Sequence, residues 1–167
     1  MQKCIWPLLV VSLLLCPRIS QAQDLGFKGI GARLGLVDAD GTDTTVFFGA
    51  HVHLGELIQN LVLMPSIDYF SKNNVDIFSV NGNVRYYFPT NGNTAFFLGG
   101  GLAIVHVSVD RGPFRDDNKT RLGLNVLGGA DFPLGDRFVA TAKLIYVTRG
   151  DQVKVMGGIT YMFGGKR

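Results

Sequence analysis

His106 and Ser108 are the residues of this chain whose types and spacing come nearest to catalytic chemistry. A histidine can take the proton of a serine hydroxyl that attacks an acyl carbon, provided that an acid orients the imidazole. Asp110, Asp116 and Asp117 follow the pair and could supply this acid, which would give acyl-transfer chemistry. Because the chain has no nucleophile elbow, we expect the pair to be polar residues at the end of a strand.

Two histidines, His51 and His53, could contact one metal ion, because residues two apart in a strand face the same way. No third ligand is evident, and two histidines make a weak site. We therefore expect no metal and predict that both side chains line an interior. Asp38, Asp40 and Asp43 resemble part of a calcium loop, but the glycine is misplaced for an EF-hand. They predict an exposed turn, and the sequence indicates no cofactor.

Two short motifs lie in segments that read as turns or strand ends. Residues 149–151 read Arg-Gly-Asp, a sequence that integrins bind, but glycine and aspartate are also what a tight turn requires. Residues 118–120 form a glycosylation sequon, which acts only in hosts that have the machinery. We expect ordinary surface roles for both.

The first 22 residues predict a cleaved secretory signal. Lys3 supplies the positive charge, residues 8–16 form a short apolar core, and residues 20–22 place small side chains where signal peptidase reads them. The apolar core is too short to span a membrane. The chain therefore divides into a signal peptide, 1–22, and an exported domain, 23–167. Both cysteines lie in the signal, so this domain has no disulfide.

The composition excludes several classes of protein. Of the 167 residues, 47% are hydrophobic, 17% are charged and 22 are glycine. So many apolar residues exclude a disordered chain, and the run of about 18 apolar residues that a membrane-spanning helix needs does not occur. The net charge falls from +3 to +1 when Lys3 and Arg18 leave with the signal. We therefore expect no nucleic-acid partner.

Apolar and polar residues alternate in eight segments after the signal, which predicts eight β-strands. In the fourth segment, for example, Phe78, Val80 and Val84 share one face while Ser79 and Asn83 share the other. The eight segments are 29–36, 45–54, 61–70, 77–88, 95–105, 121–132, 137–147 and 152–163. Compact links at 55–60, 89–94 and 133–136 alternate with links at 37–44, 71–76, 106–120 and 148–151.

The charged residues within these segments all lie on the polar face. A soluble barrel or sandwich would turn its apolar face inward, whereas a transmembrane barrel turns that face toward lipid. The apolar face runs for about ten residues, the length that a tilted strand needs to cross a bilayer. We therefore predict an all-β fold, an eight-stranded antiparallel up-and-down transmembrane β-barrel, with a soluble exported barrel that binds an apolar ligand as the alternative. The charged residues are Arg33, Asp68, Arg85, Arg121, Asp131, Arg137, Lys143 and Lys154.

This arrangement resembles the small eight-stranded outer-membrane barrels of Gram-negative bacteria, the OmpA/OmpX-like superfamily, over about the whole exported domain. Gly158, Tyr161 and Phe163 match the pattern by which the barrel assembly machinery recognises the last strand of such proteins. Met156 stands where a polar residue is usual, and Phe163 does not end the chain. The resemblance implies an outer-membrane location, a monomer, and three partners: membrane lipid, lipopolysaccharide and the assembly machinery.

Eight strands enclose a lumen that side chains just fill, so we expect no general diffusion pore. Charges in such a lumen must be paired, because an uncompensated buried charge is costly. Asp68 and Asp131 are the candidate partners of Arg33, Arg85 and Lys143. The pairs that form depend on the shear of the barrel, which the sequence leaves open.

Our first functional hypothesis is a non-enzymatic barrel with a structural or surface-interaction role that presents short extracellular loops. The alternative is a lipid-modifying enzyme, because His106 and Ser108 resemble part of the site of the outer-membrane lipid A deacylases. That family also uses a glutamate, and Glu56, the only glutamate of this chain, is predicted on the opposite side of the membrane. The resemblance to the deacylases therefore lacks its third residue.

Overall fold

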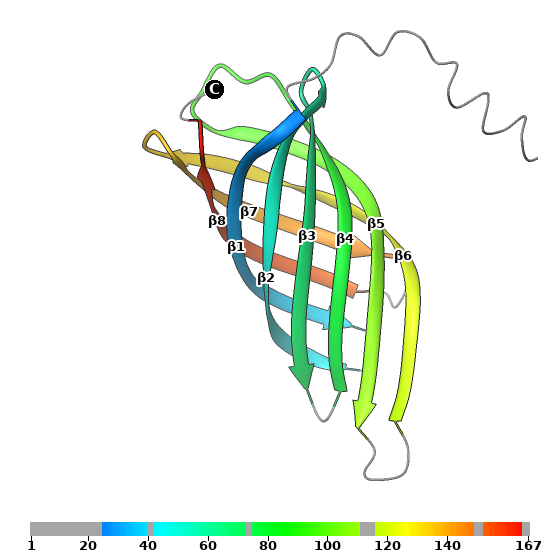
Figure 1. Ribbon diagram of the computed structural model, residues 1–167. Helices are drawn as coiled ribbons and strands as arrows, with labels where there is room; N and C mark the ends of the chain where they lie inside the picture. The colour runs from blue at the N-terminus through cyan, green and yellow to red at the C-terminus, as the bar shows by residue number, and fades with distance from the viewer. Residues whose placement is uncertain (1–24, 40–41, 73–74, 111–115, 149–151, 165–167) are drawn as a thin grey trace, which may run out of the picture.

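The computed structural model describes residues 25–39, 42–72, 75–110, 116–148 and 152–164, which form a closed barrel of eight strands (Figure 1). Every strand is antiparallel to the next, and β8 closes the barrel against β1. This confirms the predicted up-and-down topology. The strands are β1 (Leu25–Ala39), β2 (Thr42–Ile58), β3 (Leu61–Lys72), β4 (Val75–Tyr87), β5 (Ala95–Asp110), β6 (Asp116–Leu134), β7 (Phe138–Val147) and β8 (Gln152–Met162).

The barrel has two distinct ends. We call the end where β1 begins and β8 finishes the terminal end, and the end where β3 and β5 finish and β4 and β6 begin the distal end (Figure 1). The terminal end also carries the β2–β3, β4–β5 and β6–β7 links. Among the described residues, no helix is long and apolar enough to cross a membrane.

Several strands are longer than the alternating segments predicted. β5 and β6 stay paired as far as Asp110 and Asp116, so the predicted long link at 106–120 is mostly a continuation of the hairpin. The last β6 residue paired with β7 is Asn125, opposite Val147. The outer part of the β5–β6 hairpin therefore stands beyond the β7 edge. The hydrogen bonds of the hairpin continue beyond the point where the apolar alternation stops. For that reason the alternation underestimated the lengths of these strands.

The outer face of the barrel is apolar. Large hydrophobic side chains project from every strand, and Leu34 and Val126 are 60% and 58% exposed. The inner face instead buries Arg33, Asp68 and Lys143, each at most 5% exposed. Most large apolar residues of the strands thus face outward, whereas these three charged residues face inward, which overturns the alternative of a soluble barrel with an apolar interior.

Glycines on the inner face make room for large side chains on neighbouring strands. A Cβ added at Gly101 would lie 2.6 Å from Oδ1 of Asn83, and one at Gly129 would lie 2.8 Å from Cζ of Phe97. Real Cβ atoms do not approach other atoms so closely. The many glycines therefore belong to a narrow lumen packed by side chains.

One part of the wall is irregular. The pairing of β2 with β3 shifts register between His51 and Glu56. Pro65 lies in the facing stretch of β3 and has no N–H to donate to the ladder. Gly55 adopts a positive φ of 85° at the same place, a conformation that glycine permits without strain. The irregularity lies at the terminal half of the barrel, next to His53.

Candidate functional site: the polar lumen

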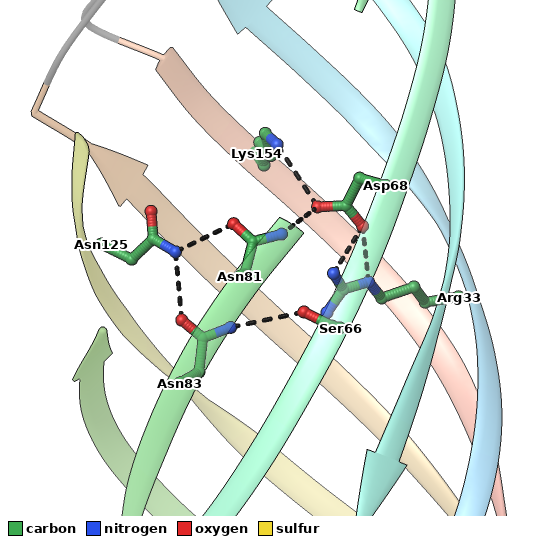
Figure 2. A network of polar contacts seen from close by, with 7 residues as sticks. All are labelled: Arg33, Ser66, Asp68, Asn81, Asn83, Asn125 and Lys154. Carbon is green, nitrogen blue, oxygen red and sulfur yellow. Dashed lines mark hydrogen bonds and ion pairs between the residues drawn. The ribbon is translucent and has the colours of Figure 1, made fainter. Parts of the chain in front are cut away.

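One carboxylate, Asp68, organises the centre of the lumen (Figure 2). The Nε of Arg33 donates a hydrogen bond of 2.7 Å to its Oδ1. The Nζ of Lys154 lies 3.4 Å from Oδ2, and the side-chain amide of Asn81 donates to the same oxygen at 3.2 Å. Asp68 is only 2% exposed. Both of its oxygens thus have cationic or amide partners, as a buried carboxylate requires.

A chain of amides continues from this carboxylate across the lumen (Figure 2). The Nδ2 of Asn125 donates to the Oδ1 atoms of Asn81 and Asn83, at 3.1 and 3.0 Å. The Nδ2 of Asn83 in turn lies 3.5 Å from the hydroxyl of Ser66. These residues come from β3, β4 and β6, so the network ties distant strands together through the interior.

The second carboxylate, Asp131, is held mainly by hydroxyl groups. The hydroxyls of Tyr87 and Thr141 each donate to it at 2.6 Å, one to each oxygen. Arg85 is farther away, with 3.9 Å between its Nη1 and Oδ2 of Asp131. Its guanidinium lies over the ring of Phe97, 4.5 Å from the ring centroid, in a cation–π contact.

The structure brings together some of the five predicted lumen residues and not others. Arg33 pairs with Asp68, and Arg85 lies within weak ion-pair distance of Asp131. Lys143 is buried, but among the described residues it forms neither an ion pair nor a hydrogen bond. Lys154, which the sequence did not indicate as a partner, lies on the second side of Asp68 instead.

Sequence reasoning missed the neutral members of the lumen network. Tyr87, Thr141 and the three asparagines carry no charge, so the requirement that buried charges be paired does not single them out. All five alternate in register with the inward-facing charges, so the period-two pattern was the signal that could have found them.

The two histidines line the interior, as the alternation predicts, and each contacts a neutral partner. His51 Nε2 lies 2.8 Å from the hydroxyl of Thr160. The backbone N–H of Gly55 donates to Nδ1 of His53 at 3.2 Å. In the described part of the chain, no three histidine, cysteine or acidic residues are placed to hold a metal ion.

A cavity of about 630 Å³ opens at the terminal end of the barrel. His53, Met64, Tyr87, Asp131 and Met162 contribute to its wall. Elsewhere the lumen holds apolar side chains, including Phe47 and Phe97, which are 0% and 1% exposed. The interior is therefore filled along part of its length and hollow at one mouth.

His106 and Ser108 lie on β5 near the distal end, in a strand and not in a loop. Nδ1 of His106 lies 3.0 Å from the hydroxyl of Thr120, its cross-strand neighbour on β6. Ser108 stands opposite Asp76 on β4 and Asn118 on β6. The side chains of Asp110, Asp116 and Asp117 lie outside the described residues, as do the signal peptide, Asp40 and residues 149–151.

Gly158 and Tyr161 of the predicted assembly motif lie on the closing strand β8, and Phe163 directly follows its end. Gly158 faces Arg33 of β1 and Thr141 of β7. The ring of Tyr161 contacts Phe138 and Phe163, with centroids 5.3 and 5.5 Å apart. The aromatic pair of the motif thus projects outward at the terminal end, where more aromatic rings gather.

Comparison with known proteins identifies the fold. No protein-family model matches the chain, and no curated protein sequence matches it. The solved structure of the N-terminal β-barrel domain of Pseudomonas aeruginosa OprF is similar, with a TM-score of 0.62 and 15% identity over 83% of this chain and 99% of that one. Neisserial surface protein A gives 0.62 and 18%, over 82% and 96%.

A third similar structure is Ail, the attachment invasion locus protein of Yersinia pestis, solved in complex with the heparin analogue sucrose octasulfate. Its TM-score is 0.59 and its identity 17%, over 82% of this chain and 97% of that one. The described chain therefore has the fold of the small eight-stranded transmembrane barrels that the sequence pattern resembles. At these identities, the likeness establishes fold alone.

Proposed function

We propose that this protein is a non-enzymatic integral barrel of a Gram-negative outer membrane, with a structural or surface-interaction role. The observation that carries the proposal is the distribution of side chains: large apolar residues are exposed on the outer face, and charged residues are buried in the lumen. Lipid is the environment in which such an outer face is stable. The similar structures from Pseudomonas, Neisseria and Yersinia support an outer-membrane location.

Aromatic rings at the terminal end support the same placement. Phe27 stacks on Phe163 with centroids 5.0 Å apart, and Tyr86 meets Phe88 edge-on at 5.4 Å. Aromatic side chains gather where acyl chains give way to headgroups, because one part of the ring is apolar and its edge or hydroxyl tolerates water. This belt would anchor the terminal end at the periplasmic interface, with both termini in the periplasm.

The distal end would then face the outside of the cell. The β5–β6 hairpin stands beyond β7 there and carries the exposed cations Lys119 and Arg121. These cations would form charge-assisted hydrogen bonds with phosphate groups of lipopolysaccharide at the membrane surface. Because side chains occupy much of the lumen, a surface role fits the molecule better than general diffusion.

Fractionation and a heat-modifiability gel test the proposal. The protein should be extracted from membranes by detergent but not by high salt, and its band should change mobility on boiling, as a folded barrel unfolds. A protein recovered without detergent in the soluble periplasmic fraction, with no change in mobility, would contradict it.

The replacement Ser108→Ala separates this role from lipid-modifying catalysis. His106 contacts Thr120 through Nδ1, the nitrogen through which an orienting acid would act in a catalytic triad. We therefore expect the lipid A profile of cells expressing Ser108→Ala to match that of cells expressing the unchanged protein, by mass spectrometry. A modification of lipid A that appears with the unchanged protein and disappears with the variant would establish the enzyme instead.

A further inference from the structure

The lumen carries more positive than negative charge. Among the described residues, the buried cations are Arg33, Arg85, Lys143 and Lys154, and the buried carboxylates are Asp68 and Asp131. Removing a charge from water costs several kcal/mol, and attraction to an opposite charge must offset this cost. Two cationic side chains thus remain without an equivalent anion.

Both carboxylates are already occupied. Asp68 binds Arg33, Lys154 and the amide of Asn81. Asp131 accepts hydrogen bonds at 2.6 Å from Tyr87 and Thr141. Each of the four carboxylate oxygens therefore already accepts a hydrogen bond from another lumen side chain.

Arg85 and Lys143 are the two buried cations with the weakest contact to a carboxylate. Arg85 is 2% exposed, and its Nε and Nη1 have no hydrogen-bond partner. Lys143 is 5% exposed and, within the described residues, has neither a hydrogen bond nor an ion pair. The 3.9 Å from Arg85 to Asp131 is too long for a hydrogen bond. Donors that belong to buried cations therefore lack acceptors.

These two cations lie beside the same aromatic ring inside the barrel. The guanidinium carbon of Arg85 lies 4.5 Å from the ring centroid of Phe97. A Cβ added at Gly129 would lie 2.8 Å from Cζ of that ring and 3.0 Å from the Cα of Lys143, which stands opposite Gly129 on β7. Arg85 of β4 and Lys143 of β7 therefore both border the space around Phe97.

We propose that the lumen binds a small monovalent anion of the size of chloride between Arg85 and Lys143. Such an anion accepts hydrogen bonds from several N–H donors at once and needs no donor of its own. It would supply acceptors for Nε and Nη1 of Arg85 and for the ammonium of Lys143. The site reaches beyond the surface role proposed above, because it concerns the interior of the barrel.

Halide-dependent stability is the first test, on the folded full-length barrel purified in detergent. Replacing sodium gluconate with sodium chloride at constant ionic strength should raise the unfolding midpoint, because a ligand that binds only the folded state stabilises it. Lys143→Met should lose this chloride dependence. The matched control is Lys119→Met, which removes an exposed lysine and should retain the full shift.

Crystals grown in bromide give the second test. We expect an anomalous scattering peak between Arg85 and Lys143 that is absent from Lys143→Met. Finding no peak in the unchanged protein, or equal stabilisation by chloride and gluconate, would overturn the proposal. So would a chloride shift that survives in Lys143→Met.

A charge-complementation variant keeps the proposal testable if Lys143→Met does not fold. Met156 stands directly opposite Lys143 on β8 and faces the lumen. The glutamate of Met156→Glu is similar in size to the methionine that it replaces. Its carboxylate would lie beside the ammonium of Lys143 and occupy the position of the anion. Its unfolding midpoint should no longer respond to chloride, and its bromide peak should be lost. A variant that folds and responds to chloride as the unchanged protein does would refute the site.

Discussion

At the scale of single residues, Asp68 is the side chain on which the interior depends most. It compensates two cations, Arg33 and Lys154, that are 5% and 3% exposed. Removing one partner of a buried ion pair lowers stability more than replacing both partners by apolar residues, because the remaining charge stays buried without compensation.

Asp68→Asn should therefore lower the free energy of unfolding by about 3–5 kcal/mol, the usual cost of an uncompensated buried charge. Urea unfolding of the barrel in lipid vesicles, followed by the mobility shift on gels, measures it. Asp38→Asn is the matched control, since Asp38 is exposed, and should change stability by less than about 0.5 kcal/mol. Equal effects of the two substitutions would show that Asp68 is not the centre of the network.

Asp76, at the distal end of β4, offers a test by titration. Hydrogen bonds from the hydroxyls of Ser71 and Tyr69 lower the pKa of its carboxyl below the ordinary value of 3.8. Tyr69 donates at 2.8 Å. A lowered pKa means that the contribution of this group to stability is present above pH 3.8 and is lost as the pH falls through the folded value. Tyr69→Phe should raise the midpoint that carbon NMR detects for this carboxyl, and an unchanged midpoint would refute the contact.

The residue scale also marks where sequence reasoning reached its limit. The period-two pattern placed Arg33, Asp68 and Lys143 on one face, and the structure has all three inside. The partners could not be read from that pattern, because they depend on how far each strand slides against the next. Asp68 and Lys154 are 86 positions apart and meet across the lumen, so no local spacing indicates their contact.

At the scale of elements, the inward glycines set how closely side chains from neighbouring strands can pack. Gly129 lies on β6 opposite Lys143 of β7. An added Cβ would meet Phe97 at 2.8 Å and the Cα of Lys143 at 3.0 Å. Gly82 of β4 faces outward, and an added Cβ there would have nothing within 4 Å.

Gly129→Ala should therefore destabilise the barrel by about 1–3 kcal/mol through overpacking. Gly82→Ala should be neutral or slightly stabilising, because it restricts the unfolded chain and meets no obstacle. Urea midpoints of the two variants check the difference. If both glycines tolerate alanine equally, the lumen is less tightly packed than these distances indicate.

The sequence predicted which segments form strands and which side chains point into the barrel. It did not predict how long each strand is. The alternation in 95–105 and 121–132 identified β5 and β6, yet the strands run to Asp110 and from Asp116. Beyond the apolar stretch, the two strands are held by their own hydrogen bonds, and side-chain polarity no longer reports pairing. The irregular pairing of β2 near Pro65 was likewise invisible to the alternation, although the proline itself was a signal.

At the scale of the whole molecule, the position of the bilayer on the outer surface can be tested by placing one charged residue there and measuring the loss of stability. Leu102 projects outward from the middle of β5 and is 52% exposed. His106 lies on the same face of the same strand but nearer the distal end.

Leu102→Arg should destabilise the barrel in a bilayer by about 2–4 kcal/mol, while His106→Arg should cost about 0–1 kcal/mol, because the penalty falls toward the interface. Folding into vesicles of phosphatidylcholine at a series of urea concentrations measures both. If the substitution at position 106 destabilises the barrel as much as the one at position 102, the bilayer does not have the position that the exposed apolar residues of the outer face indicate.

The occupied lumen has a consequence for the organism that makes this protein. Phe47, Phe97 and the asparagine network stand where a porin would hold water. A cell could therefore insert many copies into its envelope without admitting more hydrophilic antibiotic or losing more nutrient. Abundance would be limited by crowding among neighbouring envelope proteins and not by leakage.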